Sequence, residues 1–166
     1  MKEINVKELG KSAVSLFDDN WALLTAGNTE SYNTMTVSWG AMGELWNKDV
    51  CFCFVRPQRY TYEFIEREEY FTLSFFAEDY KKALAFCGRN SGRDVDKAKE
   101  TGLTAKAEGD SVSFEEAEIV LLCKKVAFQD IRPEGFLDSA IDPTCYPDKD
   151  YHRMYIGEIV SCKIKK

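Results

Sequence analysis

The chain has one histidine, four prolines and no Cys-x-x-Cys spacing. A histidine-based metal site or a serine triad is hard to assemble from one histidine, so the sequence predicts no metal site. No apolar run approaches the roughly 18 residues of a membrane span, and the charged start MKEINVKELGKS lacks the apolar core of a signal peptide. We therefore expect no membrane partner and a cytoplasmic location.

Excess positive charge is also missing. The chain has 22 Lys and Arg against 28 Asp and Glu, which gives a net charge of −6 and a pI near 5.0. Nucleic acids and anionic membranes attract proteins that carry a basic face. The composition predicts neither as a partner.

Six cysteines are scattered along the chain: Cys51, Cys53, Cys87, Cys123, Cys145 and Cys162. Cys51 and Cys53 alternate in the strand-like stretch VCFCFV, so both side chains lie on one face. This spacing favours free buried thiols in a reducing compartment over a metal site.

Apolar patterning predicts six strands and four helices in one domain, residues 1–166. The expected strands are 20–27, 32–46, 49–56, 70–76, 115–131 and 153–165. The expected helices are 6–17, 57–68 (opened by Pro57), 79–88 (ended by Gly88) and a short one reaching Glu100, capped by Ser91 or Asp94 and stopped by Gly102. Residues 132–150 read as a loop.

Strands and helices do not alternate strictly in this reading, and most connections are short. The pattern is typical of a mainly β fold with inserted helices, in which an antiparallel sheet closes into a barrel. No strand is followed by Gly-x-Gly-x-x-Gly, which argues against a dinucleotide-binding parallel sheet.

Small hydroxyl side chains share one face of the strand YNTMTVSWG. Thr34, Thr36 and Ser38 alternate with Asn33, Met35, Val37 and Trp39. Such a face can hydrogen-bond a flat polar ligand without blocking its approach. An ordinary solvent-facing strand gives the same pattern, because threonine is favoured in strands.

Two stretches gather cations in this acidic chain. In VRPQRYT, Arg56 ends a strand and Thr61 lies in the first helical turn, where backbone N–H groups favour an anion. The alternative is that these arginines pair with Glu63 and Glu66.

The second stretch is CGRNSGRDVDKAKETG, residues 87–102. Arg93 and Lys97 are four residues apart and share a helix face, with Arg89 one loop away. The sequence predicts an anion here, or neutralisation of these cations by Asp94 and Asp96. The stretch has no Walker A spacing.

His152 stands alone in KDYHRMYIGEI. A single histidine is usually structural. It can also place a proton donor at the edge of a redox cofactor.

Taken in order, WALLTAG, YNTMTVSWGAMG, FVRPQRYTYEFI, YFTLSFF, GRNSGRDVDKAKETGLT and YIGEIV resemble the flavin reductase-like family, and most closely its flavoredoxin-type members. The resemblance implies an antiparallel Greek-key split β-barrel. It also implies a homodimer with one FMN per protomer near the subunit interface, and a possible redox partner protein.

Carried over by position, the resemblance assigns cofactor contacts to three groups of residues. Thr36 and Ser38 would meet the flavin ring within the segment Thr34, Met35, Thr36, Val37, Ser38 and Trp39. Arg56, Arg59 and Thr61 would hold the phosphate, beside Val55 and Tyr60. Ser74 would lie beside the flavin, and Ser91, Gly92, Arg93 and Lys97 would line the pocket or its rim. His152 matches a histidine often preceded by aspartate, whereas here Tyr151 intervenes after Asp150.

The implied function is an oxidoreductase that moves electrons from NAD(P)H or a protein donor through FMN to a second acceptor. Two other functions remain open: an FMN electron carrier that does not use NAD(P)H, and a flavin-binding redox sensor that uses Cys87. The cation cluster at 87–102 would bind either the FMN phosphate or the phosphates of NAD(P)H.

Overall fold

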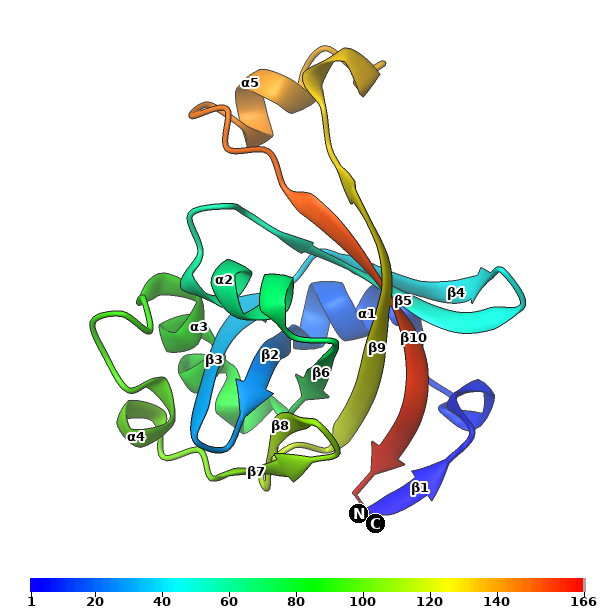
Figure 1. Cartoon of the computed structure of the whole chain (residues 1–166), viewed down its shortest axis with the longest axis vertical. Helices are drawn as coiled ribbons and strands as arrows, with labels where there is room; N and C mark the ends of the chain where they lie inside the picture. Colours follow the sequence, from blue (N-terminus) through cyan, green and yellow to red (C-terminus); the bar gives the residue numbers. More distant parts are fainter. Residues whose placement is uncertain (166) are drawn as a thin grey trace.

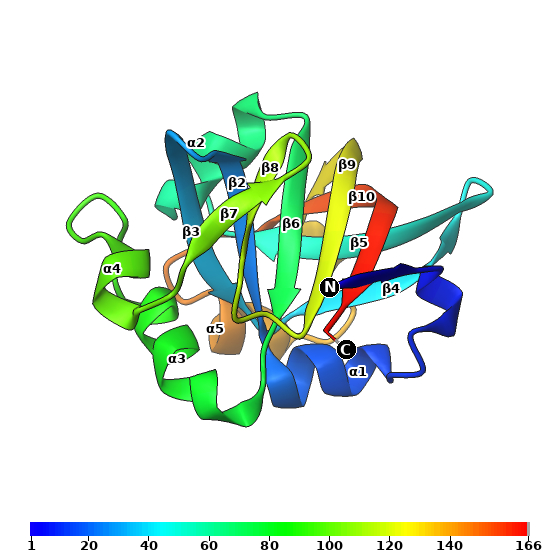
Figure 2. The ribbon, with the colours of Figure 1, turned by 90° about the horizontal axis from the view of Figure 1, so that it is seen from below.

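The computed structural model describes residues 1–165, and its main feature is an antiparallel sheet of eight strands. Seven strands follow the order β3-β2-β6-β9-β10-β5-β4, and β1 pairs with β10. A separate hairpin, β7–β8, packs against β2 and β6 (Figure 2). The strand bounds are β1 Lys2–Ile4, β2 Ala22–Asn28, β3 Ser31–Val37, β4 Gly40–Leu45, β5 Lys48–Val55, β6 Tyr70–Phe75, β7 Ala105–Glu108, β8 Ser111–Phe114, β9 Ile119–Asp130 and β10 Arg153–Ile164.

Short helices cover the β3 side of the sheet and the tip of a long arm. The arm consists of the ends of β9 and β10 that extend beyond the body, together with residues 131–152 between them (Figure 1). Figure 1 shows α2, α3 and α4 gathered beside β2 and β3, while α5 sits where β9 and β10 extend beyond the body. The α-helices are α1 Ala13–Ser15, α2 Tyr60–Arg67, α3 Lys81–Arg89, α4 Lys97–Thr101 and α5 Ile141–Cys145. The other turns are 3₁₀ (η1 Val6–Glu8, η3 Glu78–Tyr80, η4 Pro133–Gly135) or π (η2 Leu16–Asn20). None of the helices described is long and apolar enough to cross a membrane.

The predicted fold class is confirmed: the protein is mainly β and antiparallel, with inserted helices. The expectation of a closed barrel is wrong, because β3 and β4 lie at opposite ends of the strand order and do not pair within residues 1–165. The single strand expected over 32–46 is two strands, β3 and β4, because the chain passes from one edge of the sheet to the other within this segment. The chain crosses between the sheet edges at Ser38 and Trp39, and a Cβ on Gly40 would lie 2.3 Å from the Phe17 ring.

The helices expected at 6–17 and 57–68 form only in part. Gly10 adopts φ +63°, and the chain splits there into η1 and the later α1. Pro57 does not open α2. It lies in a turn closed by the bond from the Arg59 N–H to the Arg56 carbonyl, and the helix begins at Tyr60.

Several other segments differ in extent from the sequence prediction. Strand β9 begins at Ile119 instead of 115, and α3 runs through Gly88 to Arg89. The loop expected at 132–150 contains η4 and α5. β1 and the β7–β8 hairpin carry no strong alternation and were not anticipated.

The core has two parts. The larger cluster fills the sheet and includes Leu24, Phe71, Leu73, Cys51 and Cys53, so both cysteines lie on one buried face as predicted. The smaller cluster joins Leu23 and Val120 of the sheet to Leu84 and Cys87 of α3 and Phe114 of β8. All six cysteines are free, five of them buried and Cys145 half-buried. The second cluster holds α3 against β3, where the candidate site lies.

Candidate functional site

Strand β3 is the edge on which the site is built. The Thr34 carbonyl accepts a hydrogen bond from Lys97 Nζ at 2.7 Å. In an antiparallel ladder a residue's N–H and C=O point to the same side, and the side alternates along the strand. The backbone groups of Thr34 and Thr36 therefore point away from β2, toward the segment 88–97.

The two threonines of the hydroxyl face make contacts inside the protein, whereas Ser38, just past the end of β3, is exposed. Thr34 is buried and its Oγ1 lies 2.9 Å from Thr25 Oγ1, while the Thr36 hydroxyl donates to the Leu84 carbonyl of α3. Gly88 lets α3 approach this closely, since a Cβ there would lie 3.3 Å from Thr36 Cβ. The Thr36 hydroxyl thus fastens α3 to β3, and the Thr34 hydroxyl joins β3 to β2, so the backbone edge of β3 is what remains for a ligand.

A cavity of about 230 Å³, called here the Trp39 cavity, opens at the end of β3. Its lining gathers seven residues expected at the site, together with Phe54: Met35, Thr36, Val37, Ser38, Trp39, Arg56 and His152. Trp39 is 46% exposed, and its ring centroid lies 5.1 Å from that of His152. An indole beside an open strand edge suits a flat aromatic ligand.

His152 is a buried, neutral residue in the lining of this cavity. It is 8% exposed, and its Nδ1 lies 2.9 Å from the Tyr146 hydroxyl. Burial, reinforced by the nearby charge of Arg56, lowers the pKa of His152 to about 4. The imidazole is uncharged at neutral pH and has a hydrogen bond to offer instead of a charge.

Arg56 is already engaged by the arm. Its guanidinium pairs with Asp150, donates to the Cys145 carbonyl at 2.9 Å and lies 5.2 Å from the Tyr146 ring centroid. The sequence placed Arg56 together with Arg59 and Thr61. The structure puts Arg56 in the Trp39 cavity and the other two in the next cavity along β3.

That second cavity, the Arg59 cavity, has a volume of about 150 Å³. Thr61 is buried in the first turn of α2 and accepts a 2.7 Å bond from Asn33 Nδ2, while Arg59 donates to the Gly88 carbonyl at 2.7 Å. Burial, followed by the charge of Arg56, lowers the pKa of Arg59. The lining is Asn33, Gln58, Arg59, Tyr60, Thr61, Arg89, Asn90, Ser91, Gly92 and Lys97.

Lys97 is the buried cation of this cavity. It is 5% exposed, and its ammonium group donates to the carbonyls of Thr34 and Cys87 at 2.7 and 2.8 Å. No carboxylate of residues 1–165 pairs with it within 4.0 Å. Burial lowers the pKa of Lys97 to about 8, and the positive charge of Arg59 acts in the same direction.

Arg93 does not share a helix face with Lys97, so that prediction is wrong. Residues 91–96 form turns, and α4 begins only at Lys97 with Asp96 as its N-cap. Arg93 instead pairs with Glu63 and lies 4.6 Å from the Tyr60 ring centroid. Asp94 and Asp96 therefore do not neutralise Arg93, and Glu63 does.

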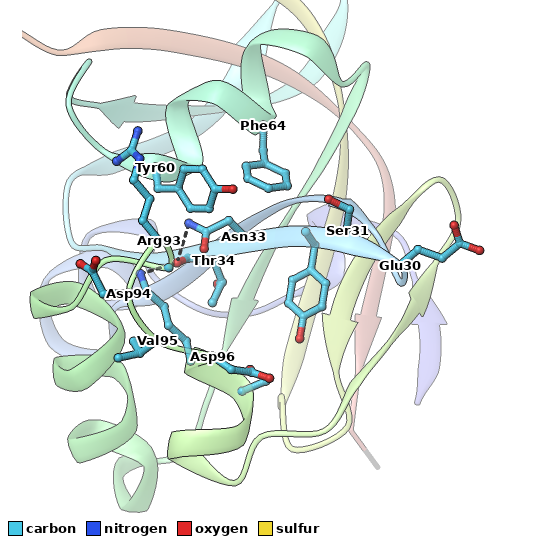
Figure 3. Close-up of a pocket in the computed structure, with 14 residues that line it drawn as sticks. Glu30, Ser31, Asn33, Thr34, Tyr60, Phe64, Arg93, Asp94, Val95 and Asp96 are labelled. Carbon is cyan, nitrogen blue, oxygen red and sulfur yellow. Dashed lines mark hydrogen bonds between the residues drawn. The ribbon is translucent and has the colours of Figure 1, made fainter.

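Lys97 also lines a third and larger cavity of about 500 Å³, which Figure 3 shows with its lining side chains. Its walls include the rings of Tyr60 and Phe64 and the carboxylates of Asp94 and Asp96. A Cβ on Gly92 would lie 1.8 Å from Asn33 Oδ1, so the 91–92 turn touches β3 directly. Asn33, Gly92 and Lys97 line both this cavity and the Arg59 cavity.

Two expected site residues line none of these three cavities. Val55 is fully buried in the larger core cluster. Ser74 is fully buried between Leu23 and Val120 on β6, and its hydroxyl has no hydrogen-bond partner among the described residues. Their assignment to a cofactor stays a prediction.

Sequence reasoning missed two contributors. Asn33 is a buried asparagine in a strand interior, an uncommon choice that signals a polar contact. Tyr146 lies in the proline-containing loop, where no periodic pattern shows which side chains turn inward. Within residues 1–165 no group of three or more His, Cys, Asp or Glu side chains is placed to hold a metal ion.

Comparison with known proteins identifies the fold. The family model described as flavin reductase like domain matches residues 14–166. No curated protein sequence matches the chain.

Solved structures of low sequence identity share the architecture. Flavoredoxin of Desulfovibrio vulgaris (Miyazaki F) is 22% identical, with a TM-score of 0.69 over 100% of this chain and 78% of that one. An FMN-binding protein from Thermus thermophilus is 17% identical, with a TM-score of 0.68 over 88% and 71% of the two chains. A 2-nitrobenzoate 2-nitroreductase from Pseudomonas fluorescens is 17% identical, with a TM-score of 0.68 over 98% and 77%. The resemblance in sequence and the split-barrel fold are confirmed.

Proposed function

The chain belongs to the flavin reductase like domain family, and from that premise we propose that it binds FMN along the open edge of β3. The FMN-binding protein and the flavoredoxin among its structural neighbours support this proposal. The two cavities on β3 suit the two ends of such a ligand. One has an indole wall and the other a set of cations.

The observation that carries the proposal is the buried ammonium group of Lys97. A buried cation without a paired carboxylate is costly unless an anion approaches it. Lys97 has three donors, of which two are used by carbonyls, so one remains for a ligand. With Arg59 alongside and the first turn of α2 below, the cavity fits a phosphate.

The flavin ring would lie in the Trp39 cavity. There the backbone edge at Thr36 and Ser38 would offer N–H and C=O groups to the polar side of the ring, and the Trp39 indole would cover one part of it. Arg59, Thr61, Ser91 and Lys97 would hold the phosphate at the other end. Tyr60 and Gly92 line the same cavity, whereas Arg93 lines the larger cavity and pairs with Glu63.

FMN, when bound, supplies reversible hydride and electron transfer. The chain's own groups would bind it, orient it and exclude water. Because His152 is neutral, we assign it a hydrogen bond to the ligand in the Trp39 cavity instead of a proton transfer at pH 7. We place the protein among oxidoreductases that take electrons from NAD(P)H or a protein donor and pass them to a second acceptor.

A second candidate function is an FMN electron carrier that exchanges electrons with protein partners. The arm formed by β9 and β10 favours it, because Phe128, Leu137 and Ile141 expose apolar side chains there. A redox sensor based on Cys87 is less well supported. The thiol is fully buried, and burial raises its pKa, which lowers its reactivity.

We also propose a homodimer, as the family resemblance implies, with the Trp39 cavity near the subunit interface. Exposed apolar residues at two projecting hairpins support it: Trp46 at the β4–β5 turn and Phe128 on the arm. Light scattering on the protein at micromolar concentration should give about twice the chain mass of 19.0 kDa. A monomer that retains stoichiometric FMN would rule out a pocket completed by the partner.

Two measurements separate the proposed functions. The absorption spectrum of the protein mixed with FMN should show the shifted bands of a bound flavin. Steady-state oxidation of NADH and of NADPH by that mixture, with a dye as acceptor, should exceed the rate with free FMN. If flavin binds but neither nucleotide is oxidised faster than with free FMN, the electron-carrier function is favoured instead.

A further inference from the structure

The imidazole of His152 is hydrogen-bonded to a described residue through only one of its two ring nitrogens. Its ring lies near Trp39, Phe54 and Tyr146, with centroid distances of 5.1, 6.4 and 5.5 Å. The Tyr146 hydroxyl is the hydrogen-bond partner that the structure gives to Nδ1, and no described residue bonds Nε2. Nε2 is thus the nitrogen that is free to serve a ligand in the Trp39 cavity.

A neutral imidazole carries one proton, and its position decides what the ligand meets. If the proton is on Nε2, the cavity contains a donor. If it is on Nδ1, the cavity contains an acceptor. The hydrogen bond made by Nδ1 settles which of the two forms is stable.

Tyr146 keeps its own proton. The ring is 2% exposed, and burial raises the pKa of its hydroxyl, so the phenol is intact at neutral pH. The structure gives the Tyr146 hydroxyl no other hydrogen-bond partner among the described residues. The phenol O–H then has His152 Nδ1, 2.9 Å away, as its acceptor. With a protonated Nδ1, the Nδ1–H would donate to the phenol oxygen, and the buried phenol O–H would be left without an acceptor among the described residues.

We propose that Tyr146 is a positioning residue that holds His152 with its proton on Nε2, so that the Trp39 cavity presents an N–H donor. The Nε2–H of His152 would donate a hydrogen bond to an acceptor atom of the ligand, either a carbonyl oxygen or an unprotonated ring nitrogen. That use rests on the proposed function. The protonation state of the imidazole itself does not.

The arm is built to keep Tyr146 in place. The Tyr146 N–H donates to the Asp142 carbonyl at 2.9 Å, and Phe136 stacks on its ring at 5.8 Å with an interplanar angle of 14°. The Arg56 guanidinium also lies over the Tyr146 ring, 5.2 Å from its centroid, and fastens the chain at Cys145 and Asp150. Arg56 thus links the arm to the Trp39 cavity, because it lines the cavity and its guanidinium pairs with Asp150 of the arm.

The single histidine makes the test direct, since the imidazole ¹⁵N spectrum contains one pair of signals. In the flavin-free protein at pH 7 we expect a protonated Nε2 and an unprotonated Nδ1 shifted by a hydrogen bond. In Tyr146→Phe the Nδ1 signal should lose that shift, and the two signals should move toward each other as the second tautomer becomes populated.

Tyr151→Phe is the matched control. Tyr151 lies in the same segment, and its hydroxyl donates to Asp142 at 2.9 Å instead of to His152. This variant should keep the wild-type imidazole signals. A wild-type spectrum with a protonated Nδ1, or a Tyr146→Phe spectrum identical to wild type, would overturn the proposal.

The wild-type spectrum alone tests the protonation state, even if Tyr146→Phe fails to fold. Titration with FMN then separates the two proposals. If Nε2 is protonated and FMN does not bind, the proposed function fails and the role of Tyr146 stands. If FMN binds and Nδ1 carries the proton, the role of Tyr146 fails and the proposed function stands.

Discussion

Lys97 Nζ lies 2.7 Å from the carbonyl oxygen of Thr34, and this bond joins the start of α4 to the open edge of β3. It places a buried positive charge beside the strand whose backbone faces the candidate ligand. The cation and the strand edge are therefore parts of one site, even though they are 63 residues apart in the sequence.

The first prediction concerns pH. In the flavin-free protein the pKa of Lys97 is about 8. The Lys97 ammonium group therefore adds a positive charge to the site below pH 8 and loses that charge above it. FMN affinity should be full below pH 8 and fall as pH rises above it, by up to about tenfold per unit, since one pKa unit is worth about 1.4 kcal/mol. Fluorescence titration with FMN from pH 6.5 to 9.5 measures the effect.

The control for that titration lies in the same helix. Lys97→Met should weaken FMN binding at pH 7 by about 1–3 kcal/mol, the range for a hydrogen bond to a charged group, and should flatten the pH dependence. Lys99→Met removes an exposed charge from α4 and should leave the profile unchanged. An identical profile in wild type and Lys97→Met would show that another group titrates.

The second prediction separates two arginines. Arg59→Gln removes a cation from the Arg59 cavity and should weaken FMN binding by about 1–3 kcal/mol while riboflavin binding changes little. Arg56→Gln releases the arm from the Trp39 cavity and should weaken both flavins to a similar extent. Calorimetric titration of both ligands into both variants measures the difference. If Arg56→Gln affects FMN alone, Arg56 contacts the phosphate after all.

The third prediction concerns the turn at residue 92. In Gly92→Ala the new Cβ would lie 1.8 Å from Asn33 Oδ1, so the turn or the strand must move. We expect a loss of about 1–3 kcal/mol in unfolding free energy, the usual range for overpacking, together with weaker FMN binding. Gly135→Ala, which meets nothing within 4 Å, is the control and should match wild type in denaturant titrations.

The fourth prediction concerns stability in acid. The pKa of His152 is about 4 when folded and near 6.5 when unfolded, so the unfolded chain binds more protons between these values. Unfolding free energy is then highest above pH 6.5 and falls as pH drops toward 4. Relative to His152→Gln, which does not titrate, the wild type should lose about 2 kcal/mol between pH 7 and pH 4.5. An equal loss in the two proteins would mean that folding does not lower the pKa of His152.

Sequence patterns predicted the elements whose burial is periodic. The alternation of Met35 and Val37 and the apolar run around Cys51 and Cys53 follow from strand geometry, and the structure confirms both. The same alternation continues through Ser38 and Trp39, where the chain changes from one sheet edge to the other. Period-2 patterning does not register such a crossing, so one strand was expected in place of β3 and β4.

The site could be predicted only as far as its residue types. Arg93 and Lys97 have helical spacing, yet the helix begins only at Lys97, with Asp96 as its N-cap. Arg93 therefore lies outside the helix and pairs with Glu63, whereas Lys97 points inward. Long-range partners decide such outcomes. The pairing of Arg56 with Asp150 and of Tyr146 with His152 depends on how the arm folds back, which local spacing does not encode.

The most direct test of the account compares the affinities of the wild-type protein for FMN and riboflavin at pH 7. The two ligands share the ring and differ in the phosphate, which is the group that Lys97, Arg59 and Thr61 are proposed to hold. We expect FMN to bind at least tenfold more tightly than riboflavin, and we expect this preference to disappear in the double variant Lys97→Met with Arg59→Gln. Equal affinity of the wild-type protein for the two flavins would contradict it.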